Sequence, residues 1–103
     1  MKLVFISGPY RANHYDDIEA NIKRAGNAAL ELWKQGFAVL CPHMNTAHFD
    51  DAGLTDNMAL KGDLVLLSRC DAIYMLRDWR MSAGAIAEHD AAVDWGLEII
   101  YQL

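Results

Sequence analysis

The sequence predicts an α/β fold, a small doubly wound, Rossmann- or flavodoxin-like parallel sheet of about four strands with helices on both faces. Two observations lead to this prediction. Short apolar runs of strand length alternate along the chain with longer segments of helical periodicity. Strand–helix–strand connections are right-handed, so repeating them builds a parallel sheet that helices cover. We expect one domain over residues 1–103, because the chain shows no repeat, linker or low-complexity tract.

Four apolar runs have the length of buried strands. They are four or five residues long, and glycine, proline or charged residues bound most of them. The expected strands are Leu3–Ile6, Phe37–Cys41, Ala72–Leu76 and Leu97–Tyr101. Residues 43–54, after the second strand, are predicted to be a polar loop without periodicity.

Three segments between these runs are predicted helices. In residues 16–35 apolar positions recur at spacings of three and four, and Gly36 follows as the stop. Thr55 can cap the second helix. Its apolar stripe comprises Leu60, Leu64 and Leu67. The third helix covers 83–96. Its inward side comprises Gly84, Ala85, Glu88, Ala91, Ala92 and Trp95.

Composition excludes several classes of function. The net charge of −5 argues against an extended nucleic-acid track. The first apolar run is too short for a signal peptide or a membrane span, so we expect a cytoplasmic protein without membrane contact. Cys41 and Cys70 are interpreted as buried reduced thiols, and the histidines lack zinc-site spacing. Neither a metal nor an organic cofactor is expected.

Unusual residues follow three of the predicted strands, at the edge where doubly wound sheets bind ligands. Gly8 permits close backbone approach after the first strand, and Arg11 offers a fork for phosphate oxygens. After the second strand, His43 and Asn45 can read a base edge. The loop after the third strand is 77–82. No GxGxxG or Walker motif is present, which argues against dinucleotide binding and P-loop hydrolysis.

The last predicted helix combines an anion site with a buried carboxylate. Ser82 can cap it, so its hydroxyl and the free N–H groups behind it can bind an anion. Glu88 faces inward in an apolar setting, where desolvation raises the pKa of a carboxyl group. This arrangement suits a phosphate at one end of a small nucleotide and a reacting carbon at the other. Asp63 lies at the margin of an apolar stripe, where a carboxylate is more often exposed than functional.

The order of Ser7-Gly8-Pro9-Tyr10-Arg11, then Asp63, then Ser82-Ala-Gly84-Ala-Ile-Ala-Glu88 resembles the nucleoside 2-deoxyribosyltransferase superfamily. Within it, the chain is most similar to the branch that acts on nucleoside 5′-monophosphates as N-glycoside hydrolases, and the resemblance covers nearly the whole chain. It implies that Glu88 is the nucleophile at the anomeric carbon and that Asp63 assists around the sugar and base. The implied phosphate contacts are Gly8, Pro9, Tyr10, Arg11, Ser82 and Gly84. Base and sugar contacts are expected from Ser7, His43, Asn45 and Asp78.

The resemblance implies a retaining double displacement, in which water or a second base resolves a glycosyl-enzyme. Asp63 is the first candidate to protonate the leaving base and Asp78 the second. Phe5 stands where the family often has a tyrosine that orients the nucleophile, and Tyr10 is an open alternative for that hydroxyl. The sequence leaves open the base, the sugar and the acceptor.

Two other functions are compatible with the same residues. The same cradle can serve a non-catalytic nucleotide-binding module, in which Glu88 accepts a hydrogen bond from a sugar hydroxyl. A partner-binding domain is the third hypothesis, if Trp79 and Trp95 lie on the surface. A homodimer is expected for so small a domain. The family often completes each site with a residue from a partner's C-terminal segment, and that point stays open here.

Overall fold

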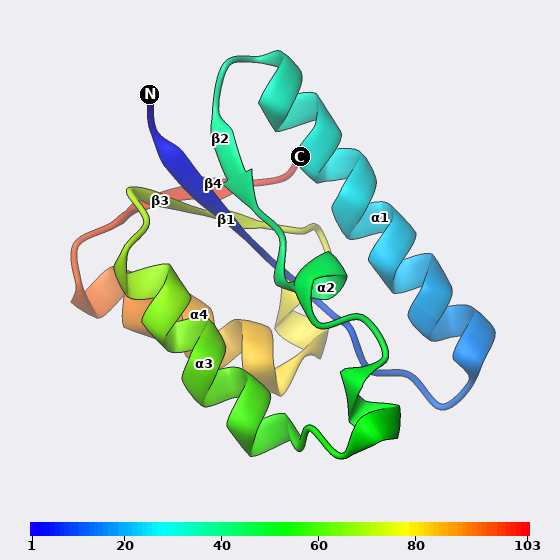
Figure 1. Cartoon of the computed structure of the whole chain (residues 1–103). Helices are drawn as coiled ribbons and strands as arrows, with labels where there is room; N and C mark the ends of the chain where they lie inside the picture. The colour runs from blue at the N-terminus through cyan, green and yellow to red at the C-terminus, as the bar shows by residue number, and fades with distance from the viewer.

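The computed structural model describes residues 1–103 and confirms the α/β fold (Figure 1). The strands are β1 (Leu3–Ser7), β2 (Ala38–Leu40), β3 (Ala72–Met75) and β4 (Glu98–Tyr101). All neighbours are parallel, in the order β2-β1-β3-β4. The chain leaves β1 to one side and later returns to its other side. The switch point therefore lies at the carboxyl ends of β1 and β3, where such sheets bind ligands.

The main helices cover opposite faces of the sheet. Helix α1 (Tyr15–Lys34) packs on β1 and β2 from one face, whereas α3 (Asp56–Ser68) and α4 (Ala83–Asp94) form a layer on the other face (Figure 1). The loop after β3 contains the short 3-10 helix η2 (Trp79–Met81). None of the helices has the length and apolar character that crossing a bilayer requires.

The prediction that residues 43–54 form a polar loop without periodicity was wrong. This segment contributes α2 (Pro42–Asn45) and the 3-10 helix η1 (Phe49–Ala52). Both are only four residues long, so neither shows a periodicity that a sequence can reveal. Pro42 starts α2 at a position where the missing N–H costs nothing, and left-handed His48 and Gly53 bound η1.

Side-chain alternation along β1 divides the core in two. Val4 and Ile6 pack with α1, whereas Phe5 packs with the α3 and α4 layer. Ser7 follows Phe5 by two positions and therefore faces the same layer as Phe5. A polar residue thus ends a strand that is buried from Val4 onward, on the side where α4 packs.

The prediction of which side of α4 faces inward is confirmed for most of the helix. Ala85, Glu88 and Ala92 are buried, but Trp95 is 48% exposed. The helix ends at Asp94, so Trp95 is its C-cap and leaves the helical wheel. Trp79 is buried, which removes one of the two surface tryptophans on which the partner-binding hypothesis depended.

Candidate active site

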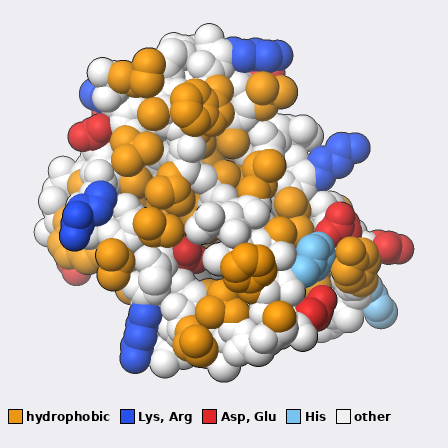
Figure 2. Space-filling view, in the orientation of Figure 1, with side chains coloured by type: hydrophobic (Ala, Val, Ile, Leu, Met, Phe, Trp, Pro, Cys, Tyr) orange, Lys and Arg blue, Asp and Glu red, His pale blue; other side chains and the backbone are white.

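A cavity of about 460 Å³ lies at the carboxyl ends of the strands. The loop that follows β1 (residues 8–14, the β1 loop), α2, η1, α3 and the start of α4 enclose it. Figure 2 shows a hollow beside α3, with an acidic side chain at its wall and hydrophobic side chains around it. The cavity brings together most of the predicted site residues, namely Gly8, Pro9, Tyr10, Arg11, His43, Asp63, Ser82, Gly84 and Glu88.

Glu88 lies in the wall of this cavity and is only 8% exposed. The Ser7 hydroxyl, itself completely buried, donates a hydrogen bond of 2.6 Å to Glu88 Oε1. Burial raises the pKa of Glu88 to about 8, Ser7 acts in the opposite direction, and the nearby charge of Asp63 adds to the rise. At neutral pH the carboxyl group therefore holds its proton for most of the time.

Asp63 brings a second carboxyl group to the cavity from α3. Burial raises its pKa to about 6. Asp63 lies at the margin of the apolar stripe of α3, so its side chain faces the cavity and is half-buried. Two interacting carboxyl groups with separated pKa values in one cavity are the arrangement that acid–base chemistry uses.

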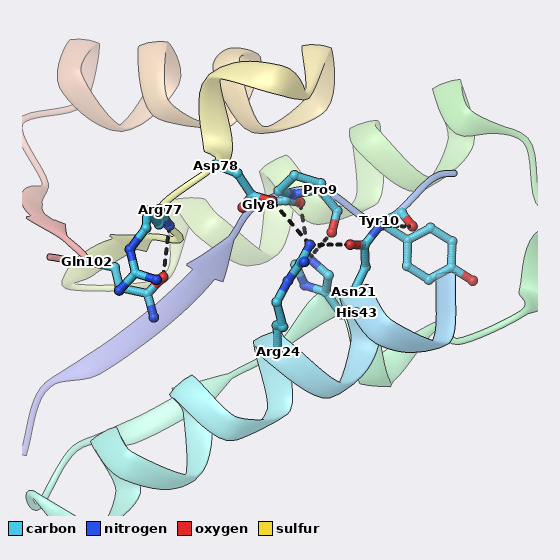
Figure 3. Close-up of polar contacts among 9 residues, drawn as sticks. All are labelled: Gly8, Pro9, Tyr10, Asn21, Arg24, His43, Arg77, Asp78 and Gln102. Atoms are coloured by element: carbon cyan, nitrogen blue, oxygen red, sulfur yellow. Dashed lines mark hydrogen bonds and ion pairs between the residues drawn. The ribbon is translucent and has the colours of Figure 1, made fainter. Parts of the chain in front are cut away.

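Leu76 and His43 fix the backbone of the β1 loop at Gly8 and Pro9. A Cβ at Gly8 would lie 2.6 Å from Leu76 Cδ1, so only glycine fits this contact. His43 Nε2 lies 3.0 Å from the Gly8 carbonyl oxygen and 3.1 Å from that of Pro9, so it donates to both (Figure 3). Burial lowers the pKa of His43 and keeps it neutral. Its Nδ1 is buried without a hydrogen-bond partner.

An ion pair on the α1 side supports the same loop. Arg24 of α1 binds Asp78 Oδ2 at 3.1 Å and also bonds Asn21, whose side chain donates to the Tyr10 carbonyl oxygen at 3.0 Å (Figure 3). Asp78 thus lies behind the loop and does not line the cavity. Asn45 is exposed and does not line it either. Neither residue is placed for the base or sugar contact expected of it.

The start of α4 provides the predicted cap. Ser82 Oγ accepts a hydrogen bond from the Ala85 backbone N–H at 3.2 Å. The first turn carries no acidic residue, and a Cβ added at Gly84 would meet only Ser82 Oγ, at 3.9 Å. The Ser82 hydroxyl proton and the first free N–H groups are therefore available to an oxygen of a ligand.

Ser7, not Tyr10, supplies the hydroxyl that holds Glu88. The Tyr10 hydroxyl donates to Asp50 Oδ1 at 3.1 Å and accepts from the His48 backbone N–H at 2.7 Å, so it is already engaged. Phe5 is fully buried in the core. Ser7 does not line the cavity as a sugar or base contact would, and it reaches the site only through Glu88.

Sequence reasoning missed two carboxylates of the cavity, Asp50 of η1 and Asp56 at the start of α3. Both bind Arg11. The Thr55 cap was a usable signal, because it fixes Asp56 in the first turn of α3. Nothing in the sequence indicated that η1 would fold over the cavity.

Comparisons with known proteins agree with the fold. A family described as "Domain of unknown function (DUF4406)" matches residues 2–101. No curated protein matches the chain. A solved structure described as "2-desoxiribosyltransferase from Leishmania mexicana" is similar with a TM-score of 0.66 and 20% sequence identity, over 98% of this chain and 63% of that one. At this identity the similarity establishes a shared fold, and the chain spans 63% of the length of that structure.

Proposed function

Because the chain belongs to the family described as Domain of unknown function (DUF4406), whose description names no activity, we propose its function from the site. We propose that it cleaves the N-glycosidic bond of a nucleoside or nucleoside 5′-monophosphate by a retaining mechanism. The observation that carries this proposal is the buried Glu88 at a small-molecule cavity, held by Ser7 and facing the same space as Asp63.

In the proposed reaction Glu88 attacks the anomeric carbon and the bond to the base breaks. Ser7 occupies Glu88 Oε1, which leaves Oε2 as the attacking oxygen. Glu88 first gives its proton to Asp63, and Asp63 then passes it to the departing base. Water or a second base attacks the glycosyl-enzyme and frees Glu88. The positive charge that develops on the sugar ring is stabilised by the carboxylates around the cavity.

Two independent similarities support this chemistry. The sequence resembles the nucleoside 2-deoxyribosyltransferase superfamily at Ser82, Glu88 and Asp63, and all three residues line one cavity. The structural neighbour is described as a 2-desoxiribosyltransferase. The cavity, at about 460 Å³, has the size of a site for a small ligand of this kind.

A non-catalytic nucleoside-binding module is the second candidate. The raised pKa of Glu88 favours it, because a protonated carboxyl group is a poor nucleophile but a good partner for a sugar hydroxyl. In this alternative the hydrogen bond from Ser7 fixes a recognition group, and Asp63 has no role in proton transfer.

Base release separates the two candidates. The purified protein is incubated with ribo- and 2′-deoxyribonucleosides and their 5′-monophosphates, and free base is measured by chromatography. We expect base release from at least one substrate, with a loss of several orders of magnitude in Glu88→Gln. The matched control is Asp90→Asn, which removes a carboxylate from the exposed side of the same helix. Binding without base release from any substrate would favour the binding module.

A further inference from the structure

Arg11 is the only lysine or arginine that lines the cavity, and it already forms ion pairs with carboxylates. Its Nε donates to Asp56 Oδ1 at 2.6 Å, and its Nη2 lies 2.5 Å from the same oxygen. Its Nη1 lies 3.9 Å from Asp50 Oδ2. The Nε and Nη2 atoms of the guanidinium therefore face Asp56, and its Nη1 atom faces Asp50. Asp56 therefore takes the Nε–Nη2 edge that a phosphate group would bind in bidentate fashion, and the Nη1–Nη2 edge faces Asp50 at a distance longer than a hydrogen bond.

The remaining charges of the cavity are acidic. Four carboxyl groups line it, those of Asp50, Asp56, Asp63 and Glu88. His43 is kept neutral by burial. Even with Glu88 protonated, three carboxylates face a single arginine. A phosphate dianion placed here meets like charges and has to compete for Arg11, whereas a neutral sugar hydroxyl does neither.

The start of α4 does not reverse this balance. Ser82 and the free N–H groups of the first turn can donate to a phosphate oxygen, but they can equally donate to the 5′-hydroxyl of a nucleoside. The discrimination between the two ligands therefore rests with the opposite wall of the cavity. There Asp50 is mostly buried and also accepts a hydrogen bond from Tyr10, so it cannot turn away freely.

We propose that Asp50 and Asp56 are specificity-determining residues that keep Arg11 occupied, so that the site selects an uncharged nucleoside over its 5′-monophosphate. This inference rests on the proposed function, and it assigns the substrate class of that site. It revises the sequence-based expectation that Arg11 serves a 5′-phosphate.

The test compares 2′-deoxyadenosine with its 5′-monophosphate, and the pairs with the other three bases, in two ways. The first is kcat/KM for base release, and the second is affinity by calorimetry in the Glu88→Gln background, which does not depend on turnover. We expect the nucleoside to be preferred by about tenfold or more at low ionic strength, and less at high salt. The double variant Asp50→Asn/Asp56→Asn should shift the ratio toward the monophosphate by about tenfold or more. Both asparagines keep the acceptor oxygens for Tyr10 and Arg11.

Two further variants sharpen the result. Adding Arg11→Ala to the double variant should cancel the shift, because the freed arginine is its cause. The single change Asp56→Asn alters a side chain that is 73% exposed, so it tests the idea in a protein whose fold is not at risk. The control is Asp51→Asn, a carboxylate of η1 that does not line the cavity, and its ratio should match that of the parent protein.

The outcomes separate this inference from the proposed function. A parent protein that prefers the monophosphate, or a ratio that the double variant leaves unchanged, overturns the specificity assignment while base release still supports the function. Preferential nucleoside binding without base release keeps the specificity assignment and rejects the glycosidase. If neither ligand binds nor reacts, both are wrong.

Discussion

Replacing Glu88 with glutamine should make the protein more stable at alkaline pH. The carboxyl group is buried and keeps one hydrogen bond, which the oxygen of a glutamine side chain can also accept, while the ionised form loses its hydration. The pKa rises from 4.5 in the unfolded chain to about 8 in the folded protein. The folded state therefore binds the Glu88 proton more tightly than the unfolded state does.

The sign and size of the effect follow from this difference. The contribution of Glu88 to stability is fully present below pH 4.5 and is lost as the pH rises to about 8. At about 1.4 kcal/mol for each pKa unit, the loss is at most roughly 5 kcal/mol of unfolding free energy. Glutamine does not titrate, so the Glu88→Gln variant lacks this loss.

The assay is urea unfolding of the parent protein and the Glu88→Gln variant at a series of pH values between 4 and 9, with the Asp90→Asn variant as control. The difference in unfolding free energy between the variant and the parent should increase with pH and level off above pH 8. Titrating groups that do not interact with Glu88 cancel in this difference. Parallel curves over the whole range would refute the claim that the fold holds Glu88 protonated.

Four further results are expected. Gly8→Ala should cost roughly 1 to 3 kcal/mol of unfolding free energy in urea, because its Cβ would overlap the Leu76 side chain. Asp63→Asn should lower the pKa of Glu88 below about 8, because it removes a neighbouring negative charge, and carbon NMR titration of the Glu88 carboxyl measures this shift. Ser82→Ala should cost about 1 kcal/mol through loss of the N-cap, and Ser82→Asp should restore most of it. Light scattering at tens of micromolar should give twice the chain mass of 11.5 kDa, and a mass of one chain would reject the expected homodimer.

Much of the fold could be predicted because it depends on patterns that one sequence shows. Apolar runs located the strands, and the spacing of small and apolar residues placed Glu88 on the inward side of α4. The segment 43–54 could not be predicted in the same way. Its short helices α2 and η1 form through turn geometry at Pro42, His48 and Gly53, which leaves no periodic signal.

The site was predictable in its types of residue and less so in their partners. Ser82, Asp63 and Glu88 meet at one cavity as expected from their places in the chain. The roles of Ser7 and Asp78 depend on pairs that lie far apart in sequence, Ser7 with Glu88 and Asp78 with Arg24. Such a pairing requires the sheet order and the helix packing, and neither was fixed by local pattern.

The most direct test of the central claim is the mass of the protein during reaction. The parent protein is mixed with the nucleoside that releases base fastest, quenched in acid, digested and examined by mass spectrometry. The proposed mechanism predicts one pentosyl group on the carboxyl of Glu88, present during turnover and absent from the Glu88→Gln variant. Base release at full rate by the Glu88→Gln variant, or a pentosyl group on another residue, would contradict it.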